Sequence, residues 1–314
     1  MNIVFFGSAK FSVPSLRALL KTKHKVACVV TQPDREKGRG LHLEGTAVKT
    51  AAEELGSKVY QAEQINTNAT INFLKDLKPD LFVVIAYGQI LSQEALNVPG
   101  TFSLNIHASL LPKYRGAAPI NWAIINGEKN TGISAIKMVK KMDAGPIILQ
   151  KIIQISDDDT AITLEEKLST LAAESLIETL DYVEANNYKL TPQEENKVTL
   201  APKLKKEDGR INWAKSAQEI YNLIRGCISW PGAFTYYRGK LLKIYNTKVT
   251  QLPSYPVTRD CGEIINVSKD GIVVTAKEGA LVIKELQIEG KRRMRVEEFT
   301  SGHKICVGDA FDKK

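Results

Sequence analysis

One continuous apolar run, LFVVIA at 81–86, constrains the fold of this 314-residue chain more than any other feature. A strand with apolar side chains on both faces must be covered on both, as happens in a parallel sheet between two layers of helices. Alternating strand and helix patterns are typical of a doubly wound sheet. The other strand patterns lie at 2–6, 25–30 and 101–106, and helix patterns lie at 46–55 and 118–125. We therefore predict an α/β fold with a Rossmann-like, mostly parallel, doubly wound sheet.

The pattern changes only after residue 208, beyond a strand pair, a long helix and a polar segment. Residues 131–139 and 147–155 read as a strand pair on either side of a turn, and a long amphipathic helix follows them. The polar segment 188–208 contains two prolines and lacks periodicity, so it predicts a linker. A helix and short strands with hairpin signals follow, which favours a small OB-like β-barrel. The expected organisation is a catalytic domain at 1–187, the linker at 188–208 and a C-terminal β-barrel at 209–314.

Charge is distributed unevenly between these parts. The net charge of the chain is +8, and residues 209–314 carry 18 Lys and Arg against 11 Asp and Glu, a net +7. A basic domain attracts polyanions, of which nucleic acid is the commonest. Solubility explains the same excess almost equally well.

Several classes of protein are disfavoured by what the sequence lacks. No apolar run reaches the roughly 20 residues that a membrane helix needs, and the N-terminus MNIVFFGSAKF does not read as a signal peptide. The four cysteines are scattered, which indicates reduced thiols and predicts no metal site. Neither a G-x-G-x-x-G turn nor a P-loop is present, which weakens dehydrogenase and NTPase readings. We expect a cytoplasmic protein without a membrane partner.

Three polar residues, Asn105, His107 and Asp143, carry the chemistry that we predict. Asn105 and His107 are two positions apart at the end of a predicted strand, so they share one face. Ligands of doubly wound sheets bind at the carboxyl ends of strands. An amide can stabilise an oxyanion, an imidazole can exchange protons near neutral pH, and a carboxylate can orient the imidazole. Without an obvious nucleophile beside them, the set suits direct transfer between two substrates.

Each of these residues also has a structural explanation. A single histidine is usually structural, and Asp143 in M-D-A-G can serve only to cap a turn. Asn105 can be a hydrogen-bonded side chain at the end of a strand.

A series of motifs gives the chain a resemblance to a known family. N-x-H at 105–107, S-L-L-P-x-x-R-G at 109–116 and the aspartate of D-A-G at 143–145 resemble the signature of formyltransferases that use 10-formyltetrahydrofolate. The branch of this family that acts on methionyl-tRNA is similar over nearly the full length. The supporting pieces are TQPDR…GRG (31–40), AYGQIL (86–91), NIHASLLPKYRGAAPI (105–120), APKL…DGRINW (201–213), IRG…WPGAF (224–234) and EGKRRM with EEF (289–299).

The resemblance implies transfer of the formyl group of 10-formyltetrahydrofolate, a co-substrate, to the α-amino group of methionine on initiator methionyl-tRNA. It assigns catalysis to Asn105, His107 and Asp143. It places the folate at a loop of four residues, Ser109, Leu110, Leu111 and Pro112. It also implies that the loop around Arg35 and Arg39 reaches the acceptor end of the tRNA, and that the C-terminal barrel helps to grip this tRNA.

A charge argument adds Lys291, Arg292 and Arg293 as phosphate contacts, with a solvated surface run as the alternative. No obligate protein partner is evident. Competing functions are formyl transfer to a small amine, such as a sugar or a ribonucleotide, or to water, and RNA binding without catalysis.

Overall fold

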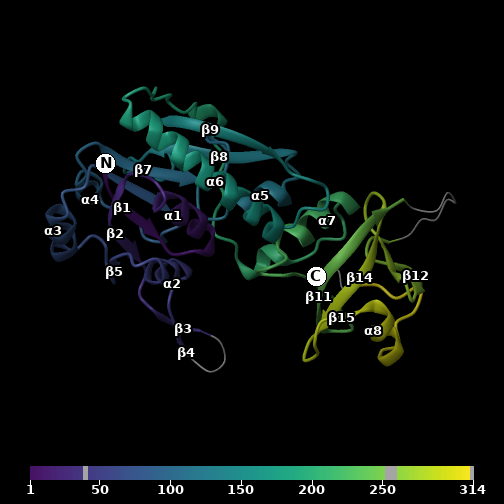
Figure 1. Ribbon diagram of the computed structural model, residues 1–314. Helices are drawn as coiled ribbons and strands as arrows, with labels where there is room; N and C mark the ends of the chain where they lie inside the picture. The colour runs from purple at the N-terminus through teal and green to yellow at the C-terminus, as the bar shows by residue number, and fades with distance from the viewer. Residues whose placement is uncertain (38–41, 252–259, 312–314) are drawn as a thin grey trace. The chain divides into compact units, whose positions relative to one another are not determined.

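The computed structural model describes residues 1–37, 42–251 and 260–311, which form two compact units (Figure 1). Unit 1 comprises Met1–Pro119, Asn130–Gln154 and Glu165–Pro202. Unit 2 comprises Ile120–Lys129, Ile155–Leu164 and Lys203–Lys314. Each unit is therefore built from separate stretches of the chain, a feature that the sequence did not predict.

Unit 1 is organised around a seven-stranded sheet in the order β5-β2-β1-β6-β7-β8-β9. The first five strands in this order pair in parallel, and β8 and β9 pair antiparallel at the edge. The strands are β1 (Asn2–Gly7), β2 (Lys25–Thr31), β5 (Val59–Gln61), β6 (Leu81–Ile85), β7 (Phe102–His107), β8 (Asn130–Lys137) and β9 (Ile147–Gln154). The predicted α/β fold, with its mostly parallel sheet and final strand pair, is confirmed.

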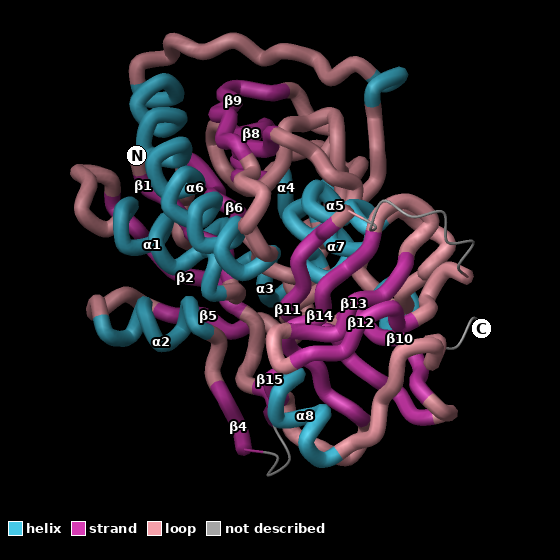
Figure 2. Tube along the Cα trace, turned by 90° about the vertical axis from the view of Figure 1, so that its right-hand side faces the viewer, coloured by secondary structure: helices cyan, strands magenta, loops and turns pink. Residues whose placement is uncertain are grey.

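Helices cover both faces of this sheet, because the central strands are apolar on both. Val4 and Phe6 of β1 pack in one core cluster with Ile71, Leu74 and Leu96 of α3 and α4. On the other face α6 lies beside α1 (Figure 2), and Ser169 Oγ of α6 donates to the carbonyl of Phe11 at 2.7 Å. The helices of this unit are α1 (Val13–Leu19), α2 (Ala47–Glu54), α3 (Asn68–Asp76), α4 (Gln93–Leu96) and most of α6 (Ala161–Glu184). Helix α5 (Pro119–Ile125) belongs, except for its first residue, to unit 2.

The sheet fixes where the polar residues of interest can lie. Strand β7 pairs in parallel with β6 and antiparallel with β8, with Asn105 opposite Ile136 and His107 opposite Ser134. Asp143 lies in the turn that joins β8 to β9. Strand β7 ends at His107, whereas the antiparallel β8 ends opposite Leu104, so the turn folds back along β7 to bring Asp143 to Asn105 and His107. Doubly wound folds bind ligands at the carboxyl end of such a parallel strand.

A small hairpin occupies the segment that the sequence predicted as a basic loop. Strand β3 (Arg35–Lys37) pairs antiparallel with β4 (His42–Glu44), so Arg35 stands opposite Glu44. The predicted contact Arg39 lies outside the described residues.

Unit 2 contains an antiparallel sheet in the order β10-β11-β14-β13-β12, with β15 on β14. Arg238-Gly239 joins β10 to β11 and Lys269-Asp270 joins β12 to β13, so hairpins form where the sequence signals at Arg238-Gly239 and Asp270-Gly271 predicted them, the second turn lying one residue earlier. Within the described part of this unit no pairing joins β12 to β10, so a closed barrel is not found. The elements are α7 (Ala217–Gly226), β10 (Ala233–Tyr237), β11 (Lys240–Thr250), β12 (Ile264–Ser268), β13 (Gly271–Thr275), β14 (Ala280–Ile288), β15 (Met294–Arg295) and α8 (Val296–Gly302).

Two early segments of the chain complete unit 2. Arg225 of α7, which is only 7% exposed, donates through Nη1 to the carbonyls of Ser156 and Asp159. Asn121 Nδ2 donates to the carbonyl of Gly226 at 2.9 Å. A buried guanidinium needs such partners, since an unpaired one costs several kcal/mol.

Candidate active site

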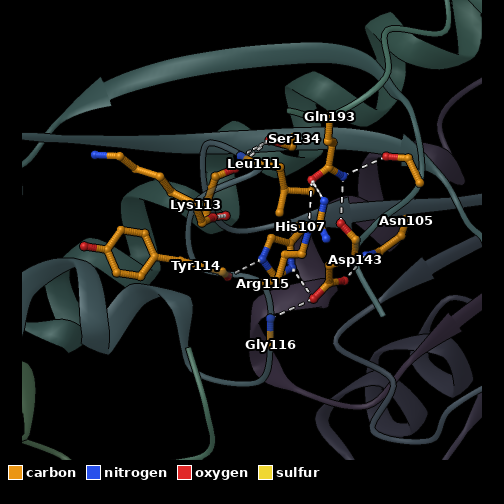
Figure 3. Close-up of polar contacts among 12 residues, drawn as sticks. Asn105, His107, Leu111, Lys113, Tyr114, Arg115, Gly116, Ser134, Asp143 and Gln193 are labelled. Atoms are coloured by element: carbon orange, nitrogen blue, oxygen red, sulfur yellow. Dashed lines mark hydrogen bonds and ion pairs between the residues drawn. The ribbon is translucent and has the colours of Figure 1, made fainter. Parts of the chain in front are cut away.

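Asn105, His107 and Asp143 meet at the carboxyl end of β7 (Figure 3). The amide Nδ2 of Asn105 donates to Asp143 Oδ1 at 3.3 Å, and His107 Nδ1 lies 3.6 Å from Asp143 Oδ2. The side chains of His107 and Asp143 are 8% and 11% exposed. The structure therefore brings the three predicted residues together, from one strand and one turn.

The Asp143 carboxylate is held by donors rather than by solvent. Besides the Asn105 amide, the backbone N–H of Gly116 donates to Asp143 Oδ2 at 2.9 Å. Hydrogen bonds to a charged group contribute about 1.5–3 kcal/mol each, which offsets the loss of hydration in a buried place. Asp143 also has a φ of 51°, in the left-handed region, which costs a non-glycine residue about 1–2 kcal/mol. The turn keeps this conformation because its neighbours hold it.

The position of the protons on His107 follows from its contacts. His107 Nε2 lies 3.0 Å from the carbonyl oxygen of Tyr114. A carbonyl oxygen only accepts, so Nε2 carries a hydrogen and donates it. Nδ1 then faces Asp143, and this nitrogen gains a hydrogen only when the ring is protonated. The proton-exchanging atom of the site is therefore Nδ1.

The predicted folate loop, residues 109–112, follows β7 directly and is anchored to the two edge strands. Ser134 Oγ of β8 donates to the carbonyl of Ser109 at 2.6 Å and accepts from Leu111 N at 3.0 Å. Gln150 of β9 donates to the carbonyl of Leu111 at 2.9 Å. Ser109 is fully buried and its hydroxyl donates to the carbonyl of Lys113. Its side chain thus shapes the loop and is not presented as a nucleophile.

Gln193 and Arg115 belong to the same cluster and were missed by sequence reasoning. Gln193 Nε2 donates to the carbonyls of Asp143 and Gly145 at 2.7 Å each. Gln193 Oε1 accepts from Nε and Nη2 of Arg115, at 3.0 and 2.8 Å. Arg115 stood in a quoted motif without a role, whereas a single Gln in a polar segment gives no local signal.

Gln193 belongs to a segment, residues 191–201, that runs along the site and that we call the strap. Thr191 exchanges two backbone hydrogen bonds with Ile147, and Thr199 accepts from the backbone N–H groups of Tyr114 and Arg115. Ala201 N donates to the carbonyl of Arg115 at 2.7 Å. The strap lies within the predicted linker 188–208. These hydrogen bonds fix residues 191–201 of the linker to the loops of the site.

An ion pair at the edge of the site involves the strap as well. Glu195 accepts from Arg115 Nη2 and from Lys141 Nζ, at 2.9 Å each. These hydrogen bonds, with that from Arg115 the larger effect, lower the pKa of Glu195. The arginine remains buried, at 4% exposure, while the glutamate is in solvent.

The predicted RNA contacts lie on two separate elements. Arg35 is exposed on β3 of unit 1, and Lys291, Arg292 and Arg293 are exposed between β14 and β15 of unit 2. Arg292 pairs with Glu298 and Arg293 with Glu285, and the Arg293 guanidinium stands 4.5 Å from the ring centre of Tyr245. Two of the three charges are therefore already engaged within unit 2.

The described ranges offer neither a metal site nor a membrane-spanning helix. There, no three His, Cys, Asp or Glu side chains group as ligands of a metal ion, and no helix is long and apolar enough to cross a bilayer. The prediction of a metal-free enzyme stays a prediction.

These contacts define what the site can do. It offers an amide donor, an imidazole nitrogen that can gain a proton, and a carboxylate, all around one point at a strand end. This combination suits attack on a carbonyl carbon, where charge develops on oxygen and a proton must leave the attacking group.

Comparison with known proteins assigns this architecture to a class. The profile of the formyl transferase family matches residues 1–180, and that of the formyl transferase C-terminal domain matches residues 203–304. The first match covers more than half of the chain, so the chain belongs to the formyl transferase family, a family of enzymes. The resemblance inferred from the motifs is confirmed.

Relatives within the family are more specific. The methionyl-tRNA formyltransferase of Acetivibrio thermocellus is 47% identical to this chain over 311 residues, 99% of each protein. That of Thermodesulfovibrio yellowstonii is 46% identical over 99% of each protein. The crystal structure of an N-formyltransferase from Helicobacter canadensis, in complex with folinic acid and dTDP-3-aminofucose, shares the fold. It has a TM-score of 0.66 and 20% identity over 90% of this chain and 98% of its own.

Proposed function

We propose that this chain transfers the formyl group of 10-formyltetrahydrofolate to the α-amino group of methionine on initiator methionyl-tRNA. The observation that carries the proposal is the meeting of Asn105, His107 and Asp143 at the end of β7. It is supported by 47% identity, over 99% of the chain, to a methionyl-tRNA formyltransferase. Because translation begins in the cytoplasm, this role implies a cytoplasmic enzyme.

The chemistry is a direct exchange of one C–N bond for another. The neutral α-amino group, whose pKa in solution is about 7.7–8.0, attacks the formyl carbon. Negative charge develops on the formyl oxygen as the tetrahedral intermediate forms. The bond from carbon to N10 of the folate then breaks, N10 takes a proton, and the former amine loses one.

Each site residue has a part in this sequence. The Asn105 amide has a second N–H hydrogen to donate to the oxyanion, and the neighbouring His107 ring, oriented by Tyr114 and Asp143, helps to stabilise the charge that develops there. Asp143 orients His107 and accepts the proton of the attacking amine, directly or through water. The loop at 109–112 supplies the surface for the folate, with its backbone held by Ser134 and Gln150.

We assign the tRNA to the basic C-terminal part. The domain boundaries of the proposal are a catalytic domain at 1–187, a linker at 188–208 and a C-terminal domain at 209–314 with an OB-like barrel. The net charge of +7 on residues 209–314 supports contact with phosphates. Arg35 and Arg39 would approach the acceptor end, and Lys291, Arg292 and Arg293 the backbone of the tRNA.

The decisive measurement is single-turnover formyl transfer from 10-formyltetrahydrofolate, with initiator and elongator methionyl-tRNA side by side. We expect rapid formylation of the initiator alone. Absence of transfer to either tRNA contradicts the proposal, and it directs the same assay to an amino sugar nucleotide and to hydrolysis of the folate.

Replacing the imidazole separates catalysis from binding. His107→Ala removes a group that stabilises the oxyanion, so the rate should fall about 10²–10³-fold. Binding of uncharged initiator tRNA, measured by fluorescence anisotropy, should stay within about twofold of the wild type. His303→Ala, at the C-cap of α8 in unit 2, is the control and should keep full activity.

A further inference from the structure

We propose that Gln193 is a positioning residue for formyl transfer, which holds the Asp143 turn against the Arg115 guanidinium. The inference rests on the proposed function, and it goes beyond that function because it assigns a role in the reaction to the strap. Gln193 contacts no reacting group, and it acts only through the place that it gives to Asp143.

Both N–H hydrogens and the oxygen of the Gln193 amide form hydrogen bonds with these groups (Figure 3). Its two N–H hydrogens go to the carbonyls of Asp143 and Gly145, both at 2.7 Å. Its oxygen takes two hydrogen bonds from Arg115. Carbonyls only accept and a guanidinium only donates, so the amide has a single possible orientation. A reversed amide would lose all four bonds.

Arg115, to which Gln193 is hydrogen-bonded, is itself held in place by burial and by its backbone contacts. Its side chain is 4% exposed, and its backbone donates to Thr199 and accepts from Ala201. The next residue, Gly116, donates its N–H to Asp143 Oδ2. Gln193 therefore closes a ring in which Asp143 is held at its main chain by the amide and at its carboxylate by Gly116.

The opposite side of the turn is closed by β8. A Cβ on Gly145 would lie 1.7 Å from the carbonyl oxygen of Lys137, so the backbone of the turn touches the end of this strand. The turn is thus confined between Lys137 and Gln193. This confinement explains how Asp143 keeps its left-handed φ of 51°.

The consequence for catalysis concerns rate rather than substrate binding. The Asp143 carboxylate acts on His107 across 3.6 Å and on Asn105 across 3.3 Å, so a small displacement changes both relations. A misplacement of about 1 Å at a reacting group can cost about 10²-fold in rate. We therefore expect kcat to depend on Gln193, and KM for either substrate to depend on it little.

The test uses the full chain with Gln193→Glu, which keeps the shape and the two contacts to Arg115 but turns an acceptor toward two carbonyls. We expect kcat to fall about 10–100-fold, with both KM values within about threefold. The control, Glu194→Gln, changes a neighbouring side chain that pairs with Lys197 at 2.8 Å, and it should leave kcat unchanged. Thermal midpoints of all variants establish that they are folded, and Gln193→Met is the replacement if Gln193→Glu is not.

A double-mutant cycle with Asp143→Asn distinguishes positioning from a general structural role. If Gln193 acts only through Asp143, the double variant is no slower than Asp143→Asn alone, within about threefold. Multiplication of the two losses overturns the proposal, and so does a Gln193→Glu variant with the kcat of the wild type.

Hydrogen–deuterium exchange makes this result independent of the substrate assignment. Peptides that cover residues 141–149 should exchange faster in Gln193→Glu than in the wild type, and unchanged exchange overturns the proposal. If the wild type formylates no tRNA, the proposed function fails, while the exchange measurement still decides whether Gln193 holds the turn.

Discussion

At the scale of single residues, the site depends on backbone groups as much as on side chains. The Asp143 carboxylate takes its 2.9 Å hydrogen bond from the N–H of Gly116, and His107 gives its Nε2 hydrogen to the carbonyl of Tyr114. At Tyr114 and Gly116 the backbone conformation therefore matters more to the site than the identity of the side chain. The conformation at position 116 requires a glycine.

Gly116 provides a direct test of this dependence. Its φ is 130°, and a Cβ there would lie 2.5 Å from the carbonyl oxygen of Ala201, which is backbone and cannot rotate away. Gly116→Ala should therefore destabilise the protein by about 2–4 kcal/mol and lower kcat as the N–H moves from Asp143. The measurements are the thermal midpoint and single-turnover formylation well below it.

Gly56→Ala is the matched control for conformational strain. Gly56 also has a positive φ, 69°, but nothing lies within 4 Å of its added Cβ. We expect a cost of about 1–2 kcal/mol and unchanged kcat. If Gly116→Ala and Gly56→Ala lose the same stability and the same rate, backbone strain alone accounts for the effect of Gly116→Ala. The close approach to Ala201 would then contribute nothing.

At the scale of elements, sequence patterns predicted what is periodic and missed what is held by distant contacts. The buried strands β1, β2, β6 and β7 follow from short apolar runs, and the long helix α6 follows from its periodicity. Asn105 and His107 could be placed on one face because a strand alternates. The strap could not be recognised, because its order comes from hydrogen bonds to residues 112–118 and 147, far away in the sequence.

One helix, α7, is expected to make the stability of the protein depend on pH. Glu219 closes a capping box with Ser216 and pairs with Lys215, and these hydrogen bonds, first that of Lys215, lower the pKa of Glu219 to about 2. Since the folded-state pKa lies below the unfolded value of about 4.3, the stabilisation is complete above that value and is lost as the pH falls toward about 2.

The comparison is between wild type and Glu219→Gln. The difference in thermal midpoint should be constant from about pH 7 to pH 5 and should narrow below about pH 4.3, where the unfolded carboxylate begins to bind protons. A difference that stays constant down to pH 3 would contradict the assigned origin of the shift.

At the scale of the whole molecule, charge and chemistry are separated along the chain. The catalytic residues lie in unit 1, whereas residues 209–314 of unit 2 hold a net charge of +7. Because phosphate contacts release counterions, the proposed tRNA binding should weaken steeply between about 50 and 200 mM salt.

The cluster at 291–293 allows the salt dependence to be assigned to residues. Lys291→Gln should reduce the slope of log Kd against log salt by about 1, as expected for one lost phosphate contact. Arg293→Gln should reduce it less, because a phosphate must compete with Glu285 for that guanidinium. Lys23→Gln, which removes one positive charge from unit 1, serves as the control. Identical slopes for all three variants would count against a contact at Lys291.

The division of the chain into two interleaved units has a consequence for biosynthesis. The path passes from one unit to the other five times, so no single cut separates them. A ribosome delivers Ile120–Lys129 and Ile155–Leu164 long before Arg225, the residue that binds the carbonyls of Ser156 and Asp159. All residues of unit 1 are available for folding once residue 202 has left the ribosome. The segments of unit 2 at 120–129 and 155–164 can complete their packing only after the last third of the chain has been synthesised.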